Sequence, residues 1–186
     1  MRIGILGGTF NPVHNGHLYI AQEARKKLSL NKVVFVPAHI PPHKKIKGNA
    51  TAINRVRMLK LALKRRKGFS FSLYEIRKKG VSYSVDTLKY FRKKYGKHTK
   101  LFFIIGSDWA GGLKGWKKAQ ELARLAVFVI APRPGFKRKK VVKTLRIARK
   151  DISSSEIRKR VKNGKAVKNL IPKSVAKYIY RKKIYL

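Results

Sequence analysis

Apolar runs alternate along this chain with segments in which apolar residues recur at helical spacing. Four short runs are apolar through their middle, as strands are when helices cover both faces of a parallel sheet: residues 3–6, 32–37, 101–105 and 127–131. Apolar residues alternate with serines over residues 69–73, which indicates a further strand, and one more is expected near residues 145–148. The most apolar run, residues 101–105, predicts a central strand.

Four segments show the spacing of an amphipathic helix. The first segment follows residue 17, the second covers residues 52–66, and the third begins near residue 84. The fourth begins near Pro172, a favoured first-turn residue. The expected buried stripes are Leu18, Ala21, Ala24 and Leu28; Ile53, Val56, Leu59 and Leu63, widened by Met58 and Ala62; Val85, Leu88, Phe91 and Tyr95; and Val175, Ala176 and Ile179. Strands alternating with helices predict an α/β fold, a doubly wound parallel sheet with helices on both faces.

The length of 186 residues predicts a single domain spanning residues 1–186. Hydrophobic residues make up 44% of the chain, and no apolar run approaches the ~20 residues that cross a bilayer. The N-terminus enters a strand without a signal-peptide pattern, and the sequence contains no cysteine. We therefore expect a cytoplasmic protein without disulfides or thiol chemistry.

Charge is the abnormal property of this composition. Lysine and arginine total 48 against 7 aspartates and glutamates, a net charge of +41. Such a balance first suggests a nucleic-acid binder, but the basic residues are spread over every segment, without an arginine-rich block, a helix-turn-helix pattern or a Cys/His finger. We expect non-specific binding of polyanions and self-repulsion that opposes tight assembly. The sequence leaves open the oligomeric state and whether the charge is natural or engineered.

The strongest chemical pattern is the stretch GGTFNPVHNGH at residues 7–17, between the first strand and the first helix. Gly7 and Gly8 permit a close approach of the backbone to a ligand. The exposed amides and the positive dipole end of the following helix favour an anion. His14 and His17 are three residues apart, so one helical turn places both imidazoles on the same side. The first turn, as we call residues 7–17, is therefore predicted to bind an anionic group.

Further polar residues follow other strands, at the edge where open α/β sheets bind ligands. Two prolines stiffen the loop that carries His43 and Lys44, and the alternative there is a solvated basic loop. Gly106 and Asp108 follow the central strand, where a carboxylate accepts ribose hydroxyls or holds a metal, unless it only caps the next helix. Trp116, close to several glycines, either stacks on a flat ring or belongs to the core.

The loop before the third helix reads SYSVDT, with Tyr83 between two serines. Ser82 or Ser84 is a candidate N-cap, and capping alone would explain a serine at this junction. Capping does not explain the tyrosine between them. On composition alone, a structural interpretation of this stretch is favoured over a functional one.

The stretch DISSSEIR precedes a C-terminal helix. Ser153 as N-cap and Glu156 three residues later form a predicted capping box. The box does not account for Ser154, Ser155 and Arg158, whose hydroxyls and guanidinium lie beside the free amides of the first helical turn. Such groups at a helix N-terminus predict a phosphate clamp.

Five motifs in order resemble one enzyme family over nearly the whole chain. GGTFNPVHNGH resembles the signature of the nucleotidylyltransferase superfamily, whose fold is Rossmann-like. PPHK, SYSVDT, IIGSDW and ISSSEIR are similar, in order and spacing, to segments of the bacterial nicotinate-nucleotide adenylyltransferases. Asn11, Ser84 and Ser155 stand where Asp, Thr and Thr are commoner, and each is a hydrogen-bonding substitution.

The resemblance implies that ATP and nicotinate mononucleotide give deamido-NAD and pyrophosphate, with Mg²⁺ held by the ATP phosphates and by no direct protein ligand. It implies catalytic roles for His14, His17, Lys44 and Arg158. The implied ATP-binding residues are Gly7, Gly8, Thr9, Phe10, His17, Gly106, Asp108, Ser154, Ser155 and Arg158, with the helical residues 150–186 completing the site. The implied mononucleotide-binding residues are Asn11, His43, Lys44, Tyr83, Ser84, Trp116 and Lys117.

Two alternatives stay open at this stage. A member of the same family can prefer the amide substrate, nicotinamide mononucleotide, because a few contacts at the ring decide between acid and amide. A non-enzymatic polyanion or nucleic-acid binder on this fold would show steep salt-dependent affinity and no pyrophosphate release. Phosphopantetheine adenylyltransferases share the first motif, but the family resemblance of SYSVDT and PPHK argues against them.

Overall fold

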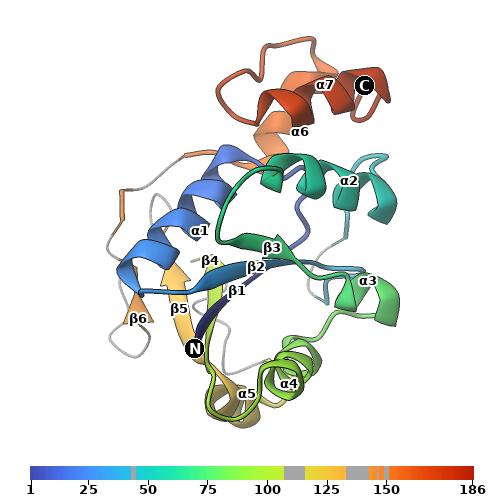
Figure 1. Cartoon of the computed structure of the whole chain (residues 1–186). Helices are drawn as coiled ribbons and strands as arrows, with labels where there is room; N and C mark the ends of the chain where they lie inside the picture. The colour runs from blue at the N-terminus through green and yellow to red at the C-terminus, as the bar shows by residue number, and fades with distance from the viewer. Residues whose placement is uncertain (43–44, 107–115, 133–142, 146, 149–150) are drawn as a thin grey trace.

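The computed structural model describes residues 1–42, 45–106, 116–132, 143–145, 147–148 and 151–186. Six parallel strands form one sheet in the order β3-β2-β1-β4-β5-β6 (Figure 1). Their bounds are β1 Arg2–Gly8, β2 Lys32–Pro37, β3 Phe69–Phe71, β4 Lys100–Gly106, β5 Val127–Ala131 and β6 Lys143–Thr144. The predicted parallel sheet is confirmed, and β1 and β4 lie side by side at its centre.

Helices cover both faces of the sheet, as the alternating pattern predicts (Figure 1). α1, α2, α6 and α7 lie on one side, and α4 and α5 lie on the other. The bounds are α1 Asn15–Lys27, α2 Ala52–Leu63, α3 Tyr74–Lys78, α4 Ser84–Tyr95, α5 Ala119–Leu125, α6 Ser154–Lys162 and α7 Lys173–Arg181. Within the described residues, no helix has both the length and the apolar character to span a membrane.

Successive side chains of a strand point to opposite faces, so the strands β1, β2, β4 and β5 contribute residues to two apolar cores. In β1, Leu6 belongs to the core under α1, whereas Ile3 and Ile5 belong to the core under α4. Phe10 and Val13 are also buried in the core under α1. The first turn is therefore anchored in that core by its own apolar residues.

The buried face of α2 differs from the predicted stripe. Ile53 is 79% exposed, and the face that packs inward carries Met58, Leu59, Ala62 and Leu63. Arg55 belongs to the same face and is 1% exposed. The predicted stripe included the four apolar residues of this face, and it was wrong for Ile53. An arginine was not expected at a core position, although Arg55 stands three and four residues before Met58 and Leu59.

Two further local predictions need correction. The N-cap of α4 is Tyr83, without a side-chain capping bond, while the Ser82 hydroxyl accepts a hydrogen bond from the His39 amide (2.9 Å). The strand expected near residues 145–148 lies earlier, as β6, and ends at Thr144. Leu145 still donates its amide to the Ile130 carbonyl (2.9 Å) and is buried, so the apolar signal came from its packing.

Candidate active site

The candidate site lies where the sheet changes winding direction. The chain runs from β1 to β2 on one side of the centre and from β4 to β5 on the other, so the crevice beyond the carboxyl ends of β1 and β4 is the switch point. Gly8 ends β1 and Gly106 ends β4. The first turn therefore begins at the position where doubly wound sheets bind nucleotides.

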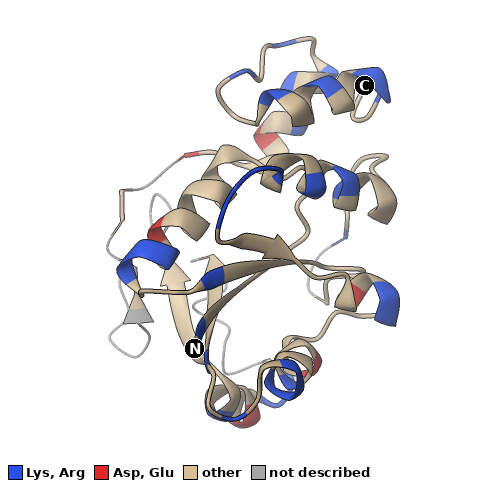
Figure 2. Ribbon diagram, in the orientation of Figure 1, with Lys and Arg blue, Asp and Glu red and all other residues tan. Residues whose placement is uncertain are grey.

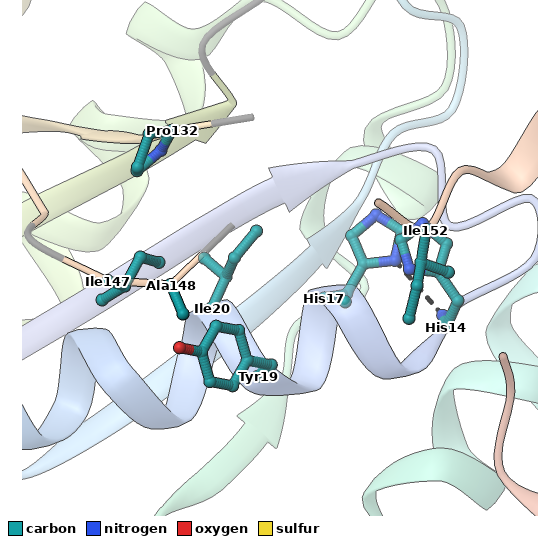
Figure 3. Close-up of a pocket in the computed structure, with 9 residues that line it drawn as sticks. His14, His17, Tyr19, Ile20, Pro132, Ile147, Ala148 and Ile152 are labelled. Carbon is teal, nitrogen blue, oxygen red and sulfur yellow. Dashed lines mark hydrogen bonds between the residues drawn. The ribbon is translucent and has the colours of Figure 1, made fainter. Parts of the chain in front are cut away.

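The two histidines of the first turn form a pair. His14 is the N-cap of α1 and is 3% exposed, and His17 is its third residue. The His14 amide donates to His17 Nδ1 (3.2 Å), and the two ring centroids are 3.7 Å apart with planes inclined by 31° (Figure 3). The prediction that both imidazoles share one side is confirmed.

Phe10 packs against the histidine pair. Its ring is fully buried, meets the His17 ring edge-on at 5.0 Å and lies 5.6 Å from the Phe35 ring. A side chain on Gly8 would approach the Phe10 ring to 3.2 Å, which explains a glycine at that position. The Phe10 ring thus belongs to the core, and it can serve a ligand only through its backbone.

The predicted phosphate clamp docks directly on the first turn. The Ser154 hydroxyl donates to the Pro12 carbonyl (3.0 Å), and Arg158 Nη1 donates to the Asn11 carbonyl (2.8 Å). Arg158 Nη2 also donates to the Ser155 hydroxyl (3.1 Å). Two segments more than 140 residues apart in sequence therefore bring their helix N-termini, imidazoles and guanidinium to one place.

The N-cap of α6 forms as predicted, but only one half of the capping box does. The Ser153 hydroxyl accepts the Glu156 amide (3.1 Å). The Glu156 carboxylate pairs instead with Arg160 Nε (2.9 Å), one turn further along the helix. In this basic chain a guanidinium outcompetes a backbone amide for the carboxylate.

A pocket opens beside the histidine pair (Figure 3). The imidazoles stand at one end, and the rest of the wall consists of Tyr19 and Ile20 from α1 and of aliphatic side chains from the segments after β5 and β6. Its lining residues are His14, Gly16, His17, Tyr19, Ile20, Pro132, Ile147, Ala148 and Ile152. The pocket therefore joins the two imidazoles to a mainly apolar wall.

A second group of predicted residues lies over the other face of the sheet. Lys117 Nζ lies 4.2 Å from the centroid of the Tyr83 ring, a cation–π contact. Trp116 is half-buried and meets Phe103 edge-on at 6.3 Å and Phe128 at 6.1 Å. Trp116 therefore fits both interpretations. Its edge-on contacts are those of a core residue, and the uncovered part of its ring leaves room for stacking on a flat ring.

Gly7 connects the two groups. A side chain on Gly7 would lie 3.6 Å from the Phe103 ring, on the face that carries Trp116. The histidine pair lies on the α1 side of the same strand end. The first turn therefore lies between the histidine pair on one face of the sheet and an aromatic group on the other. Ser84 is the first residue of α4, next to Tyr83.

Three predicted residues, His43, Lys44 and Asp108, lie outside the described residues. Asn11 is described, and its side chain is committed to the protein: Nδ2 donates to the Lys47 carbonyl (2.7 Å) and Oδ1 accepts from the Tyr185 hydroxyl (2.6 Å). Within the described residues, no group of three or more His, Cys, Asp and Glu side chains is placed to hold a metal ion.

Arg55 is a site residue that the sequence analysis missed. Its Nη1 donates to the Thr9 carbonyl (2.8 Å) and to the Ala38 carbonyl (2.7 Å), so it ties the loops after β1 and β2 together. Burial lowers the pKa of Arg55, although the guanidinium stays charged at neutral pH. The available signal was its place on the apolar face of a helix, where an uncompensated arginine is uncommon.

Glu75, one of the 7 acidic residues, supports the loop around Tyr83. Its carboxyl group is buried and accepts a hydrogen bond from the Thr87 hydroxyl (2.6 Å). Burial raises the pKa of Glu75, and the hydrogen bonds from Thr87 and Ser82 oppose that rise. The carboxyl group thus joins α3 to α4 and to the serine before it.

Comparisons with known proteins agree on one family. A model of the cytidylyltransferase-like family matches residues 5–160. The chain is 40% identical to a "Probable nicotinate-nucleotide adenylyltransferase" of Clostridium botulinum, over 99% of this chain and 98% of the relative. It is 41% identical to a protein of the same name from Bacillus cytotoxicus, with the same coverage.

Solved structures show the same fold. The nicotinic acid mononucleotide adenylyltransferase of Plasmodium falciparum complexed with NaAD superposes with a TM-score of 0.82 at 19% identity. The superposition covers 99% of this chain and 97% of that one. A second structure of the same Plasmodium enzyme, complexed with APC, has a TM-score of 0.78 at 17% identity. At such identities the likeness establishes the Rossmann-like fold over the whole chain.

Proposed function

Since the chain belongs to the cytidylyltransferase-like family and, within it, to the nicotinate-nucleotide adenylyltransferases, we propose that it transfers the adenylyl group of ATP to nicotinate mononucleotide. The products are deamido-NAD and pyrophosphate, a step of NAD biosynthesis. The observation that carries the proposal is the docking of the α6 N-terminus on the first turn. That contact assembles two histidines, an arginine and two helix N-termini around one site that suits a polyphosphate.

The proposed chemistry is a direct in-line displacement. A phosphate oxygen of the mononucleotide attacks the α-phosphorus of ATP, a new P–O bond forms, and the bond from the α-phosphorus to the β-phosphate oxygen breaks. Pyrophosphate leaves with that electron pair. The attacking oxygen is already ionised at neutral pH, so no protein base is needed. The protein has to align two polyanions and stabilise charge on the leaving group.

The proposed phosphate-binding groups lie on the α1 side of the site. In this proposal the amides of Gly8 and Thr9 and the imidazoles of His14 and His17 donate to the triphosphate. From α6, the proposed donors are the amides and hydroxyls of Ser154 and Ser155 and the guanidinium of Arg158. Imidazoles and guanidinium then stabilise charge that develops on the leaving pyrophosphate. Residues 150–186 complete the ATP site because α6 belongs to them.

The proposed binding groups for the nicotinate end of the mononucleotide lie over the other face of the sheet. Tyr83, Ser84, Trp116 and Lys117 are proposed to hold the pyridine ring and its carboxylate, with the exposed face of the indole stacking on the ring. The ammonium of Lys117, fixed over the Tyr83 ring, supplies a positive charge there. His43 and Lys44 are proposed to close over the phosphates, and Gly106 and Asp108 to hold a ribose; Asn11 is proposed to act through its backbone.

Magnesium enters this proposal as part of the substrate. The described residues offer imidazole, hydroxyl and guanidinium groups to the phosphates and no set of metal ligands. Donors of that kind fit phosphate oxygens and not a hard divalent cation, which prefers oxygen ligands. Mg²⁺ is therefore proposed to arrive on the ATP phosphates, where it neutralises charge and orients the triphosphate.

The test is pyrophosphate release measured with ATP and either nicotinate or nicotinamide mononucleotide, at moderate salt. We expect release with the acid at a kcat/KM about tenfold or more above that with the amide, because one charge-assisted hydrogen bond to the carboxylate discriminates by that much. Single-substrate reactions and replacement of ATP by CTP are the controls. Equal or greater kcat/KM with the amide would reassign the acceptor, and no release with either would reject adenylyl transfer.

A further inference from the structure

The second residue from the C-terminus reaches into the first turn. The Tyr185 hydroxyl donates to Asn11 Oδ1 at 2.6 Å, across 174 residues of sequence. Tyr185 is 5% exposed and Asn11 is 3% exposed, so both polar groups are removed from water. A buried hydrogen bond of this kind is costly to break on one side, because the remaining partner is left without water or protein.

Asn11 is the point at which three segments meet. Its Nδ2 donates to the Lys47 carbonyl (2.7 Å) in the loop after β2, and its own carbonyl accepts from Arg158 of α6 (2.8 Å). Tyr185 completes the set from the chain end. Each of these bonds uses a different atom of Asn11, so the residue can be correctly oriented in only one way.

The loop after β2 is shaped around the tyrosine. Asn49 Oδ1 accepts the Tyr185 amide (2.8 Å), and Asn49 Nδ2 donates to the Lys183 carbonyl (3.3 Å). Gly48 has a φ of 81°, and a side chain there would approach the Tyr185 ring to 3.1 Å. The Asn49 side chain therefore holds Tyr185 at its amide, and Gly48 lets the loop pack closely against its ring, so that the phenol is a well-fixed support for Asn11.

The phenol is suited to act as a permanent donor. Burial raises the pKa of Tyr185, and the nearby guanidinium groups of Arg158 and Arg55 oppose that rise without cancelling it. The hydroxyl therefore keeps its proton over the whole neutral range. Asn11 Oδ1 has no proton to give, so the direction of the hydrogen bond is settled by chemistry.

The carbonyls of the first turn are held from outside in the same way. Arg55 binds the carbonyl of Thr9, Arg158 that of Asn11 and Ser154 that of Pro12. Thr9, Asn11 and Pro12 lie shortly before His14, the N-cap of α1. The placement of the imidazoles thus depends on contacts from α2, α6 and the chain end.

We propose that Tyr185 is a positioning residue for the transfer reaction, which orients the first turn through Asn11 and so keeps the phosphate-binding groups in line. The inference rests on the proposed function for its kinetic consequence. Removing the hydroxyl should leave the same groups present but less well aligned. Misalignment lowers kcat more than it weakens binding, because the geometric demand is greatest in the transition state.

The chain provides a matched control. Tyr178 of α7 donates its hydroxyl to Asn54 Oδ1 (2.9 Å), which is the same pair of groups at a contact between α7 and α2. Tyr185→Phe and Tyr178→Phe each delete one oxygen and leave one asparagine without its donor. The two variants are expected to lower the melting temperature by similar amounts. They should differ in turnover, because only Asn11 belongs to the first turn.

We expect Tyr185→Phe to lower kcat about tenfold with a change in the KM for ATP below about threefold, and Tyr178→Phe to leave both near the parent values. Asn11→Ala combined with Tyr185→Phe should lose no more kcat than Asn11→Ala alone, since the tyrosine acts through the asparagine. Equal kcat in the two tyrosine variants, or additive losses in the double variant, would overturn the proposal.

Hydrogen exchange separates this proposal from the proposed function. The amides of residues 13–18 should exchange faster in Tyr185→Phe than in Tyr178→Phe, whether or not the parent turns over. Faster exchange in an inactive parent would reject the assigned reaction and keep the positioning of the turn. Unchanged exchange, with normal turnover of the parent, would reject the role of Tyr185 and keep the reaction.

Discussion

At the residue scale, the proposed chemistry centres on His17. Its Nδ1 accepts the His14 amide, so the neutral ring carries its proton on Nε2 and is a hydrogen-bond donor from that nitrogen. Phe10 packs against the ring edge-on and leaves it little freedom to turn. A donor whose direction is fixed in advance needs no reorganisation when charge develops on a phosphate, which is the condition for effective transition-state stabilisation.

Replacing His17 by alanine tests this role. We expect kcat to fall by about 10²–10³-fold, because one preorganised donor to a developing negative charge is lost. The measurement is pyrophosphate release at saturating substrates, and circular dichroism checks that the fold is intact. His98→Ala is the matched control, since His98 is exposed on the turn before β4, at the opposite end of the strands. Near-normal turnover of His17→Ala would exclude the histidine from the reaction.

Residues of the site differ in how far the sequence reveals them. His14 and His17 were predictable because three-residue spacing at a helix start is a local geometric fact. The Asn11–Tyr185 bond was not, because a contact across 174 residues leaves no local pattern. Arg55 was not predicted because a charged side chain normally indicates an exposed position, whereas Arg55 is buried. Residues that stand in a local motif were therefore predicted, among them Ser154 and Arg158, whereas the supporting residues Arg55 and Tyr185 were not.

At the scale of elements, the site depends on where α6 begins. Ser153 caps α6 close to where Ser154 and Arg158 contact the first turn. The hydrogen bond from the Glu156 amide to the Ser153 hydroxyl therefore affects both the stability of α6 and the geometry of the site. Thr51 caps α2 in the same manner, through the Asn54 amide (3.2 Å). These two caps have the same chemistry but differ in position. Ser153 directly precedes Ser154, which contacts the first turn, whereas α2 reaches the first turn through Arg55, four residues after its cap.

Ser153→Ala and Thr51→Ala separate the two roles. Each should lower the free energy of unfolding by about 1 kcal/mol, because an orphan amide loses its acceptor at the helix start. Only Ser153→Ala should also raise the KM for ATP, by about threefold or more, as the first turn of α6 frays beside the triphosphate. Chemical denaturation and initial rates measure the two effects. An equal KM in both variants would show that the α6 start does not contribute to binding.

The elements themselves were predicted to different degrees. β2 and β5 have the predicted bounds because fully buried strands carry a continuous apolar run. α3 was missed because five residues are too few to show a helical period. The serine cap of α4 was wrong because Ser82 finds a partner in the neighbouring loop, the His39 amide. Continuous apolar runs thus predict strand bounds well, whereas a five-residue helix and a cap that depends on a neighbouring loop were not predicted.

For the whole molecule, charge is the dominant property. Basic residues lie on every helix and around the sheet, and acidic ones are few and scattered (Figure 2). Three close pairs are Lys78–Asp86 at 2.7 Å, Lys89–Glu121 at 2.8 Å and Arg160–Glu156 at 2.9 Å. Exposed pairs of this kind contribute ~0–1 kcal/mol each, and 7 acids cannot neutralise 48 bases. The repulsion among the excess positive charges therefore destabilises the fold, and burial of the two apolar cores has to offset it.

The same surface bears on partners. A positive field attracts ATP and the mononucleotide, which are both anionic, and it speeds their encounter. It also favours non-specific binding of nucleic acids and other polyanions, which we expect to weaken steeply as salt rises. Binding to DNA or RNA in dilute buffer is thus a consequence of the charge and not evidence of a specific partner.

Salt should stabilise this protein. Raising the chloride concentration from about 0.01 M to 0.1 M shortens the screening length from ~30 Å to ~10 Å, which is less than the width of the domain. Repulsion among the 41 excess charges then falls mainly between distant groups, while the few close pairs lose little. With roughly 2–4 °C per kcal/mol for a chain of this size, relief of ~1–2 kcal/mol raises the melting temperature by about 2–8 °C.

The measurement is thermal unfolding across that range with sodium chloride, followed by circular dichroism. Tetramethylammonium chloride is the control, because a screening effect depends on ionic strength and not on which monovalent cation accompanies the chloride. Sulfate and phosphate are avoided, since both are anions that the proposed phosphate site would bind, and such binding would stabilise the fold by mass action. A melting temperature that falls steadily with chloride would mean that attraction within the close pairs outweighs repulsion, and that the folded state accommodates a charge of +41 without strain.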